Sequence, residues 1–271
     1  MSPPPPQSER TDASASIEDL VPPAIALAWG LRDHGTRGPK RGLTLEEITQ
    51  TAIELADRDG LESVSMSRLA VELEVGTMSL YRYVVSKDEL LTLMVDAGLG
   101  RPTVPPKIRQ GDWRPGLEWW ARGVRQAYRS HPWSLNVPIT APPLGPNNVA
   151  WMEVALDMMN DTPLKESEKV STLLLISGFV RNDVTLSTDI AAARKVVPPS
   201  KTYGVILSQL VDQTAYPAVC RVIASGSFDD DDDDFDTDFD YGLQRILDGV
   251  DALISRRPRH QRRIERGRSD L

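Results

Sequence analysis

The chain has 271 residues, of which 31 are Lys or Arg and 39 are Asp or Glu, so its formal net charge is -8. This balance argues against a uniformly basic coat protein but leaves room for a locally basic DNA contact. The single cysteine, Cys220, excludes a disulfide framework within the chain and a thiolate-rich metal site. Because the three histidines lie far apart in sequence, no metal-ligand spacing is present, and we expect neither a metal nor a cofactor.

Two further patterns bear on localisation. The sequence contains no run of about 18 apolar residues of the kind that spans a membrane. Its first residues, Met-Ser followed by four prolines, have neither the charged nor the apolar region of a signal peptide. We therefore expect a cytoplasmic protein with no membrane partner.

The first 41 residues are expected to form a disordered tail and a basic arm. Residues 1–22 are rich in Pro, Ser and acidic side chains and cannot bury enough apolar surface to offset the entropy of ordering. Residues 24–31 could form a short helix. Residues 32–41 follow with four basic side chains against one acid, namely Arg32, Arg37, Lys40 and Arg41.

Residues 42–101 show helical periodicity and are expected to form a compact domain. Thr44 and Glu47 have the spacing of a capping box, which opens a helix that ends at Asp59-Gly60. A short helix is predicted after Ser65 and a third from Met78 to about Val84. Ser86 and Glu89 have the spacing of a second capping box and open a fourth helix.

Residues 107–255 are also predicted to be helical, without strand alternation, and residues 256–271 to form an Arg-rich tail. The expected helices cover residues 112–130, 148–160, 166–195, 201–214, 217–225 and 241–255. The run 228–240 holds nine Asp and three Phe residues, and because like charges at this density repel, we predict a solvated loop. The tail either contacts DNA, pairs with this acidic run or serves as a disordered solubilising segment.

The most informative stretch is 65–87, where two short amphipathic helices are joined by a tight turn around Val75-Gly76-Thr77. This pattern is typical of a helix-turn-helix, in which the first helix braces the second and the second lies in the DNA major groove. The exposed residues of the second helix have side chains that can hydrogen-bond to bases or phosphates, namely Thr77, Ser79, Arg82 and Tyr83.

Residues 44–100 resemble the DNA-binding domain of the TetR family of transcriptional regulators. The resemblance rests on Leu69-Ala70, Val75, the run from Leu80 to Val84 and Lys87 before Leu90-Leu91. The remainder resembles the subgroup with a tetracycline-repressor-like C-terminal domain, especially over residues 241–250. The implied fold is all-α, with an N-terminal three-helix helix-turn-helix DNA-binding domain and an α-helical C-terminal domain for ligand binding and dimerisation.

The resemblance also implies roles for single residues. Thr77, Met78 and Ser79 would begin the recognition helix against bases, and Tyr81 and Lys87 would hold phosphates. The remaining implied contacts come from the recognition helix and from the N-terminus of the bracing helix, namely Arg82, Tyr83, Ser67 and Arg68. One departure is Glu74, where the pattern usually has Gly. Either this turn is strained, at a cost of roughly 1 kcal/mol, or the helix ends differently.

The charge of residues 41–101 is unusual for a DNA-binding domain, because 6 basic side chains face 11 acidic ones. We hypothesise that the preceding basic arm, including Arg41, adds phosphate or minor-groove contacts and supplies much of the affinity. In that case deletion of residues 1–41 lowers both the affinity and its dependence on salt, because each phosphate contact adds roughly one unit to the salt slope.

An aromatic-rich helix over 113–133 indicates a candidate effector pocket, because pockets are mostly apolar with a few polar groups. Its candidate lining residues are Trp120, Arg125, Tyr128, Phe179, Asn182 and Asp183. Ordinary core and surface positions explain any one of them equally well. The apolar stripes on 166–190 and 241–255 resemble the two helices that build the dimer interface in this family, and a palindrome reader needs two recognition helices about 34 Å apart.

We therefore predict a homodimeric, ligand-responsive DNA-binding regulator rather than an enzyme. A repressor that binds a palindromic double-stranded operator and is released by an unknown small molecule fits best. An activator or a constitutive DNA binder keeps the same DNA contacts. A small enzyme or a ligand-sequestering protein is the remaining alternative, but the sequence has no nucleophile-elbow, phosphate-loop or dinucleotide signature and no catalytic cluster.

Overall fold

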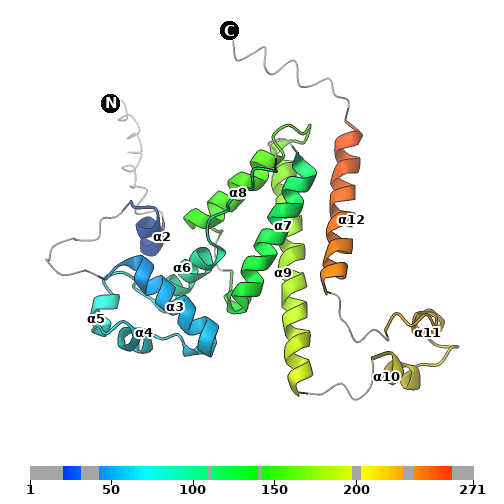
Figure 1. The fold of residues 1–271 in the computed structure, drawn as a ribbon, viewed down its shortest axis with the longest axis horizontal. Coiled ribbons are helices and arrows are strands. Elements are labelled where there is room, and N and C mark those ends of the chain that lie inside the picture. Colours follow the sequence, from blue (N-terminus) through cyan, green and yellow to red (C-terminus); the bar gives the residue numbers. More distant parts are fainter. Residues whose placement is uncertain are drawn as a thin grey trace, which may run out of the picture. The chain divides into compact units, whose positions relative to one another are not determined.

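In a computed structural model of the chain, every regular element is a helix (Figure 1), and the described residues contain no strand. The description covers residues 21–31, 43–108, 112–139, 142–196, 203–228 and 235–257. The prediction of an all-α protein is confirmed. The tail 1–20, the basic segment 32–42 and the Arg-rich segment 258–271 lie outside the described residues.

The chain divides into two compact units. The N-terminal unit comprises residues 1–100 together with 137–150, and the C-terminal unit comprises residues 101–136 together with 151–271. The segment 137–150 is thus grouped with the N-terminal unit, whereas the sequence analysis included it in the expected domain over residues 107–255. This segment makes hydrogen bonds to helix α6 (Lys87–Leu99), because the Asp96 carboxylate accepts from Asn147 N and Asn148 N.

The first helices of the N-terminal unit begin where the sequence predicts them. Helix α3 (Leu45–Asp59) starts with a complete capping box, in which the Thr44 hydroxyl accepts from Glu47 N at 3.0 Å and Glu47 Oε2 accepts from Thr44 N at 2.9 Å. A 3-10 turn (Leu61–Ser63) leads to α4 (Met66–Glu72). Helix α5 (Thr77–Leu80) follows and is shorter than predicted, because residues 81–83 form turns.

The turn between α4 and α5 has a left-handed residue at its centre. Glu74 has φ of 52°, and it is the one described non-glycine residue with positive φ. Its amide donates to Val71 O at 3.1 Å, and Val75 N donates to Ala70 O at 2.9 Å, which together form a Schellman motif. Of the two possibilities that the sequence left open, the strained turn is therefore the one observed.

The same motif closes α2 (Pro23–Ala28), the helix that the sequence suggested before the basic arm. There Gly30 takes the left-handed position with φ of 67°. Helix α2 packs on α6 (Lys87–Leu99), and Glu89 joins the two helices, since its carboxylate accepts from Val85 N at 2.9 Å and from Ala24 N at 3.2 Å. The Ser86–Glu89 capping box is therefore only half formed, because the Glu89 side chain bonds to these amides instead of Ser86 N.

In the C-terminal unit, α9 packs against both α7 and α12 (Figure 1). The bounds of these helices are α7 (Trp113–Ser130), α9 (Glu166–Val196) and α12 (Phe235–Ser255). A 3-10 segment (Pro132–Asn136) follows α7 and also contacts α9. Helix α8 (Pro146–Met158) lies between this segment and α9 in the chain. The predicted helices over 112–130, 148–160 and 166–195 are thus confirmed to within a few residues.

The acidic run is where the prediction of a loop is partly wrong. Residues 229–234 lie outside the described residues, but α12 begins at Phe235 rather than at 241. Phe239 is completely buried, and Asp236 and Asp240 form ion pairs with arginines of α7. Charge density alone predicted a loop, whereas burial of an aromatic ring and opposite charges on a neighbouring helix stabilise the extra turn.

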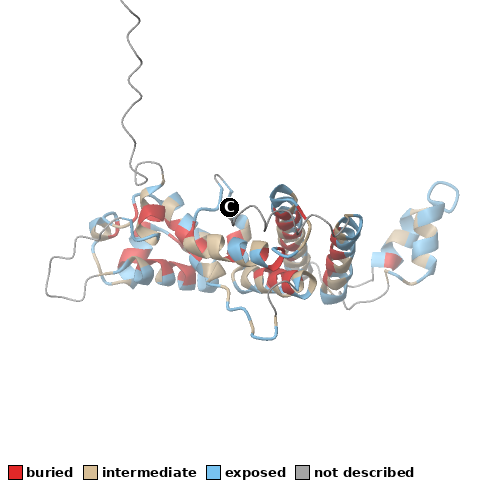
Figure 2. Cartoon of the chain, turned by 90° about the horizontal axis from the view of Figure 1, so that it is seen from above, coloured by how far each residue is buried: buried red, intermediate tan, exposed pale blue. Residues whose placement is uncertain are grey.

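Helices α10 (Tyr203–Leu210) and α11 (Pro217–Ala224) contact each other and bury almost nothing, as Figure 2 indicates by their pale colour. Gly204 is the single buried residue among the described residues of the two helices. Both helices lie inside the ranges 201–214 and 217–225 that the sequence predicted. No described helix is both long enough and apolar enough to cross a bilayer.

Candidate DNA interface and effector region

Helix α5 exposes one face and buries the other. Leu80 and Val84 are fully buried and hold the short helix against its neighbours. On the opposite side, Met78 is 78% exposed and Tyr81 is 43% exposed. Because four residues do not form a stable helix alone, this packing is what presents the outer face of α5.

Two basic side chains extend this exposed face. Arg82 and Lys87 are both exposed, and neither has an ion-pair partner among the described residues. Thr77, Ser79 and Tyr83 are half-buried in the same segment. The predicted recognition residues therefore lie on one short stretch of chain, which begins with α5 and ends at the N-terminus of α6.

The two predicted DNA contacts on α4, Ser67 and Arg68, differ in whether their side chains are already paired within the domain. Ser67 is exposed, whereas the Arg68 guanidinium donates to Asp59 Oδ2 at 2.5 Å. The amide of Arg68 donates to the Ser65 hydroxyl at 3.2 Å, so one of the α4 N-terminal amides is already capped. Arg68 is thus available to a phosphate only in competition with Asp59.

That competition belongs to a cluster of four charges at the surface. Arg58 donates to Glu72 Oε1 at 2.8 Å and to Asp59 Oδ2 at 3.2 Å. The hydrogen bonds to Glu72 and then to Asp59 raise the pKa of Arg58. The cluster explains part of the acidic balance of this domain, because these two carboxylates are neutralised by arginines within it. Arg41, the remaining predicted DNA contact, lies outside the described residues.

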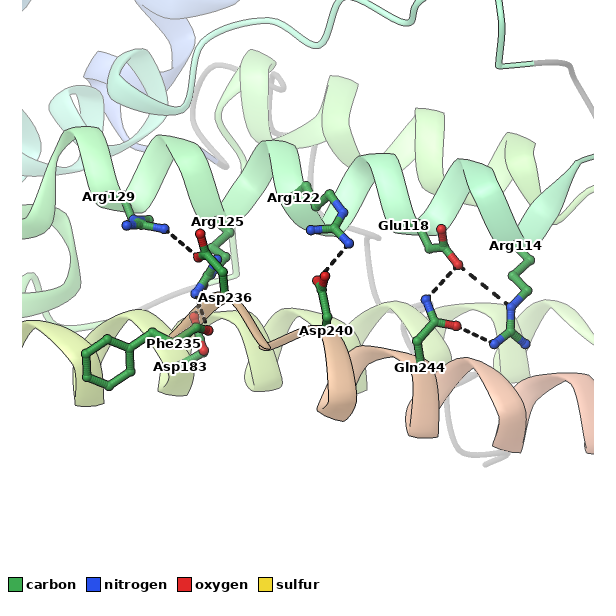
Figure 3. A network of polar contacts seen from close by, with 10 residues as sticks. All are labelled: Arg114, Glu118, Arg122, Arg125, Arg129, Asp183, Phe235, Asp236, Asp240 and Gln244. Carbon is green, nitrogen blue, oxygen red and sulfur yellow. Dashed lines mark hydrogen bonds and ion pairs between the residues drawn. The ribbon is translucent and has the colours of Figure 1, made fainter. Parts of the chain in front are cut away.

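A polar network joins α7 to α9 and α12 in the C-terminal unit (Figure 3). Arg125 Nε donates to Asp183 Oδ2 at 2.7 Å, and the two side chains are only 8% and 10% exposed. Arg125 also donates to Asp236 Oδ1 at 2.5 Å and to Phe235 O at 2.8 Å. Burial opposes the charge of Arg125, but hydrogen bonds to Asp183 and Asp236 outweigh it and raise the pKa of the guanidinium.

Aromatic rings complete the surroundings of this arginine. Its guanidinium carbon lies 4.2 Å from the centroid of the Phe239 ring, a cation–π contact. Phe179 of α9 stacks on Phe239 with ring centroids 5.4 Å apart. Three residues of the predicted effector set, Arg125, Asp183 and Phe179, are thus brought into one neighbourhood.

The other three predicted effector residues are placed differently. Trp120 is buried and donates from its indole nitrogen to Trp151 O at 2.8 Å, so it belongs to the packing of α7 on α8. Tyr128 is half-buried, and Asn182 is exposed on α9. These two residues make no described contact to the Arg125 network.

Sequence reasoning missed Asp236 and Phe239, because both lie in the run interpreted as a loop. A signal was present: Phe239 continues the apolar positions Leu243, Leu247 and Val250 at helical spacing, and all four are buried. Toward its other end, α12 is joined to α7 by Arg114, which donates to Gln244 and Asp248 at 2.6 and 2.7 Å.

Comparison with known proteins agrees with this arrangement. Residues 48–94 match the N-terminal domain described as bacterial regulatory proteins of the tetR family, and residues 105–254 match the tetracyclin repressor-like C-terminal domain. The second match alone covers more than half of the chain. The chain belongs to the TetR family.

Relatives of this TetR-family chain include curated transcriptional regulators. The HTH-type transcriptional repressor DrrR1 of Streptomyces coeruleorubidus is 39% identical over 244 residues, which cover 86% of each chain. An HTH-type transcriptional regulator of Saccharopolyspora erythraea is 30% identical over 224 residues, covering 78% of this chain and 85% of the relative.

Solved structures of TetR-family proteins share the fold. ActR from Streptomyces coelicolor in complex with actinorhodin is 28% identical, with a TM-score of 0.66, and the match covers 80% of this chain and 99% of ActR. Apo ActR gives a TM-score of 0.64 over 78% of this chain and 96% of ActR. The TetR family consists of DNA-binding regulators rather than enzymes. Helices α4 and α5, the predicted helix-turn-helix, lie within the residues that match its N-terminal domain.

Proposed function

We propose that this TetR-family protein is a homodimeric repressor that binds a palindromic operator and is released by a small-molecule effector. The observation that carries the proposal is the exposed stretch from Met78 to Lys87, where aromatic and basic side chains follow a short helix that is held in place by the buried residues Leu80 and Val84. Tyr81 and Lys87 are assigned to phosphates and Arg82 to a base edge or the backbone.

The effector half of the proposal is supported by the relatives. DrrR1 carries the name of a repressor, and ActR has been crystallised with actinorhodin and with (S)-DNPA. We place the effector beside α7 and α9, where the six predicted residues lie. The region offers aromatic rings and one charged pair, Arg125 with Asp183, which suits a ligand that has an apolar body and a polar group.

Dimerisation is supported by apolar side chains that the described chain leaves uncovered on α9 and α12. Leu174 is 72% exposed, Leu175 is 56% exposed and Tyr241 is 65% exposed. A second copy that packs on these helices would bury them and would place two recognition helices for successive major grooves. Effector binding then releases DNA to the extent that the ligand prefers the dimer state whose helices no longer fit.

The proposal is tested by binding of the purified protein to the intergenic DNA upstream of its own gene, across a series of salt concentrations. We expect tight binding that weakens steeply with salt. The double variant Tyr81→Ala/Lys87→Ala should lose affinity and have a shallower salt slope. Lys107→Ala, which removes an exposed lysine of the C-terminal unit, serves as the matched control and should bind like the wild type.

The outcomes of these measurements separate the alternatives. Binding without sequence preference, or equal binding by the double variant, contradicts the assignment of the α5 face. If that DNA is not bound, an unbiased selection from random duplexes decides whether the protein has any specific site. An effector that changes DNA affinity distinguishes the repressor from a constitutive binder, and transcription from the bound promoter distinguishes it from an activator.

The dimer is tested by measuring the mass of the protein in solution. We expect the wild type to have twice the mass of the chain, and Leu174→Glu to shift toward the monomer because a charge would be buried in the interface. Ile139→Glu is the matched control, since Ile139 is 75% exposed in the N-terminal unit. A monomeric wild type, or equal effects of the two variants, would contradict the assigned interface.

A further inference from the structure

Helix α2 is docked on α6 within the N-terminal unit. The side chains of Ala24, Ile25 and Ala26 are at most 3% exposed, and they lie on the helix that packs against α6. Just after α2, the Trp29 indole nitrogen donates to Leu144 O at 2.7 Å, and both residues belong to the same compact unit. Because a helix of six residues is not stable alone, α2 keeps its structure through this docking.

Glu89 of α6 joins the docked helix to the turn between α5 and α6. Its Oε2 accepts from Val85 N at 2.9 Å, and its Oε1 accepts from Ala24 N at 3.2 Å. The side chain is half-buried and pairs with no Lys or Arg among the described residues, so these amides are the described partners of its charge. Hydrogen bonds to an ionised group are about twice as strong as neutral ones. One carboxylate therefore fixes two separate segments of backbone.

The turn that Glu89 holds lies between the proposed DNA contacts. Residues 81–83 precede Val85, and Lys87 follows it by two positions. The Val85 side chain is 60% exposed, so burial of this residue does not fix its backbone. Its amide is held by the Glu89 carboxylate, and the Glu89 amide donates to the Ser86 hydroxyl at 3.1 Å. Glu89 thus determines how the chain enters α6 directly before Lys87.

We propose that Glu89 is a positioning residue through which the docked α2 fixes the turn that presents Lys87 to a DNA phosphate. With α2 docked, Ala24 N holds one carboxylate oxygen and keeps the other in place for Val85 N. With α2 released, the Glu89 side chain regains rotamer freedom, and the entropy of ordering it opposes the bond to Val85 N. The helix before the DNA-binding domain therefore contributes to DNA affinity independently of the basic residues that follow it.

The first measurement needs no DNA. Ile25→Asp places a charge on the buried face of α2 and should release the helix. In this variant we expect amide hydrogen exchange of the full-length protein to become faster at residues 84–87 and to stay unchanged in α3. Leu31→Asp is the matched control, because it adds the same charge directly after α2 at a residue that is 40% exposed.

The second measurement is the affinity for the upstream intergenic duplex, or for the duplex that the unbiased selection yields. It rests on the proposed function as a DNA binder. We expect Ile25→Asp to bind severalfold more weakly than Leu31→Asp, although both variants keep every basic residue of the segment 32–41. The loss should vanish when Lys87→Ala is combined with Ile25→Asp, because the contact that α2 positions is then already missing. A general loss of stability would weaken binding whether or not Lys87 is present.

Glu89→Gln is the second variant, in case Ile25→Asp unfolds the unit. A Gln side chain has one oxygen, so it can accept from only one of the two amides that Glu89 now holds. We expect it to bind DNA more weakly than the wild type, even though it removes a negative charge near the proposed phosphate contact. Asp88→Asn removes the same charge from the neighbouring exposed position, and it should bind at least as tightly as the wild type.

Several results would overturn this role of Glu89 and leave the proposed function standing. They are equal DNA affinities of Ile25→Asp and Leu31→Asp, a loss that persists in the Lys87→Ala background, and unchanged exchange at residues 84–87 on release of α2. A wild type that binds no duplex overturns the proposed function and this role with it. The two failures are therefore distinguished by whether the wild type binds DNA.

Discussion

Arg68 of the bracing helix donates to Asp59 at 2.5 Å, so a residue assigned to a DNA phosphate is already paired with a carboxylate of its own domain. Both side chains are partly exposed, at 46% and 30%, which makes the pair a weak one that a phosphate can replace. When a phosphate replaces Asp59, Arg68 exchanges one ion pair for another. The contact between Arg68 and the phosphate therefore adds less to the free energy of DNA binding than a contact from an unpaired arginine would.

We therefore expect Asp59→Asn to tighten DNA binding. Without the carboxylate, Arg68 contacts the phosphate at no loss, so affinity should rise severalfold and the salt slope should increase by up to about one unit. Binding isotherms across a salt series measure both quantities. Glu72→Gln is the matched control, because it removes the same charge from the cluster, but Glu72 pairs with Arg58 rather than with Arg68. Equal gains for the two variants would show that general charge, not Arg68, is responsible.

The left-handed conformation of Glu74 gives a prediction about stability. Glu74→Gly should raise the free energy of unfolding by roughly 1 kcal/mol, since glycine takes positive φ at little cost. Chemical denaturation of the full-length protein measures the change. Glu74→Ala removes the charge but keeps the Cβ atom, so it should gain nothing. If the alanine variant is stabilised as much as the glycine variant, repulsion between carboxylates rather than backbone strain explains the effect.

Local patterns were sufficient for most of the N-terminal unit. The box at Thr44 and the glycine after Asp59 fix the ends of α3 within a few residues, so neighbours in sequence decide them. Glu89 shows where this reasoning stops. Its spacing to Ser86 predicts a box, but the carboxylate bonds to Ala24, a partner 65 residues away that no local pattern reveals.

The structure of the C-terminal unit was harder to predict, because it depends more on contacts between residues that are far apart in the sequence. Asp236 has a sequence environment typical of a loop, and only the arginines of α7 make its helical position favourable. Arg125 and Asp183 were each identified as candidate polar residues, but their pairing was not predicted, because the two residues lie 58 positions apart in the sequence. The exposed DNA-binding residues were easier to predict, because a short motif with fixed spacing determines them.

The buried ion pair of Arg125 predicts a large effect of Asp183→Asn. Asp183→Asn leaves the buried guanidinium of Arg125 with the more exposed carboxylate of Asp236 as its one remaining described ion-pair partner, and we expect a loss of up to about 3 kcal/mol in the free energy of unfolding. Asp236→Asn removes the second partner, whose side chain is 67% exposed, and should cost about 1 kcal/mol or less. Denaturation of both variants tests the difference. A larger loss for Asp236→Asn would show that the first turn of α12 carries the stability.

Asp236 also makes the stability dependent on pH in a defined direction. The hydrogen bond from Arg125 lowers the pKa of Asp236 in the folded protein, with a further contribution from the charge of Arg129. A lowered pKa in the folded state means that the stabilisation is fully present above the ordinary pKa of an aspartate, about 3.9, and is lost as the pH falls through the lowered value.

The measurement is the difference in unfolding free energy between the wild type and Asp236→Asn at pH values from neutral to strongly acidic. We expect a constant difference down to about pH 4 and a shrinking one below it, because the protonated wild-type side chain then resembles the variant. Asp251→Asn, at an exposed position of α12, is the matched control for the loss of one aspartate charge from the same helix. A difference for Asp236→Asn that grows on acidification would contradict the assigned ion pair, since it would require a pKa raised by folding.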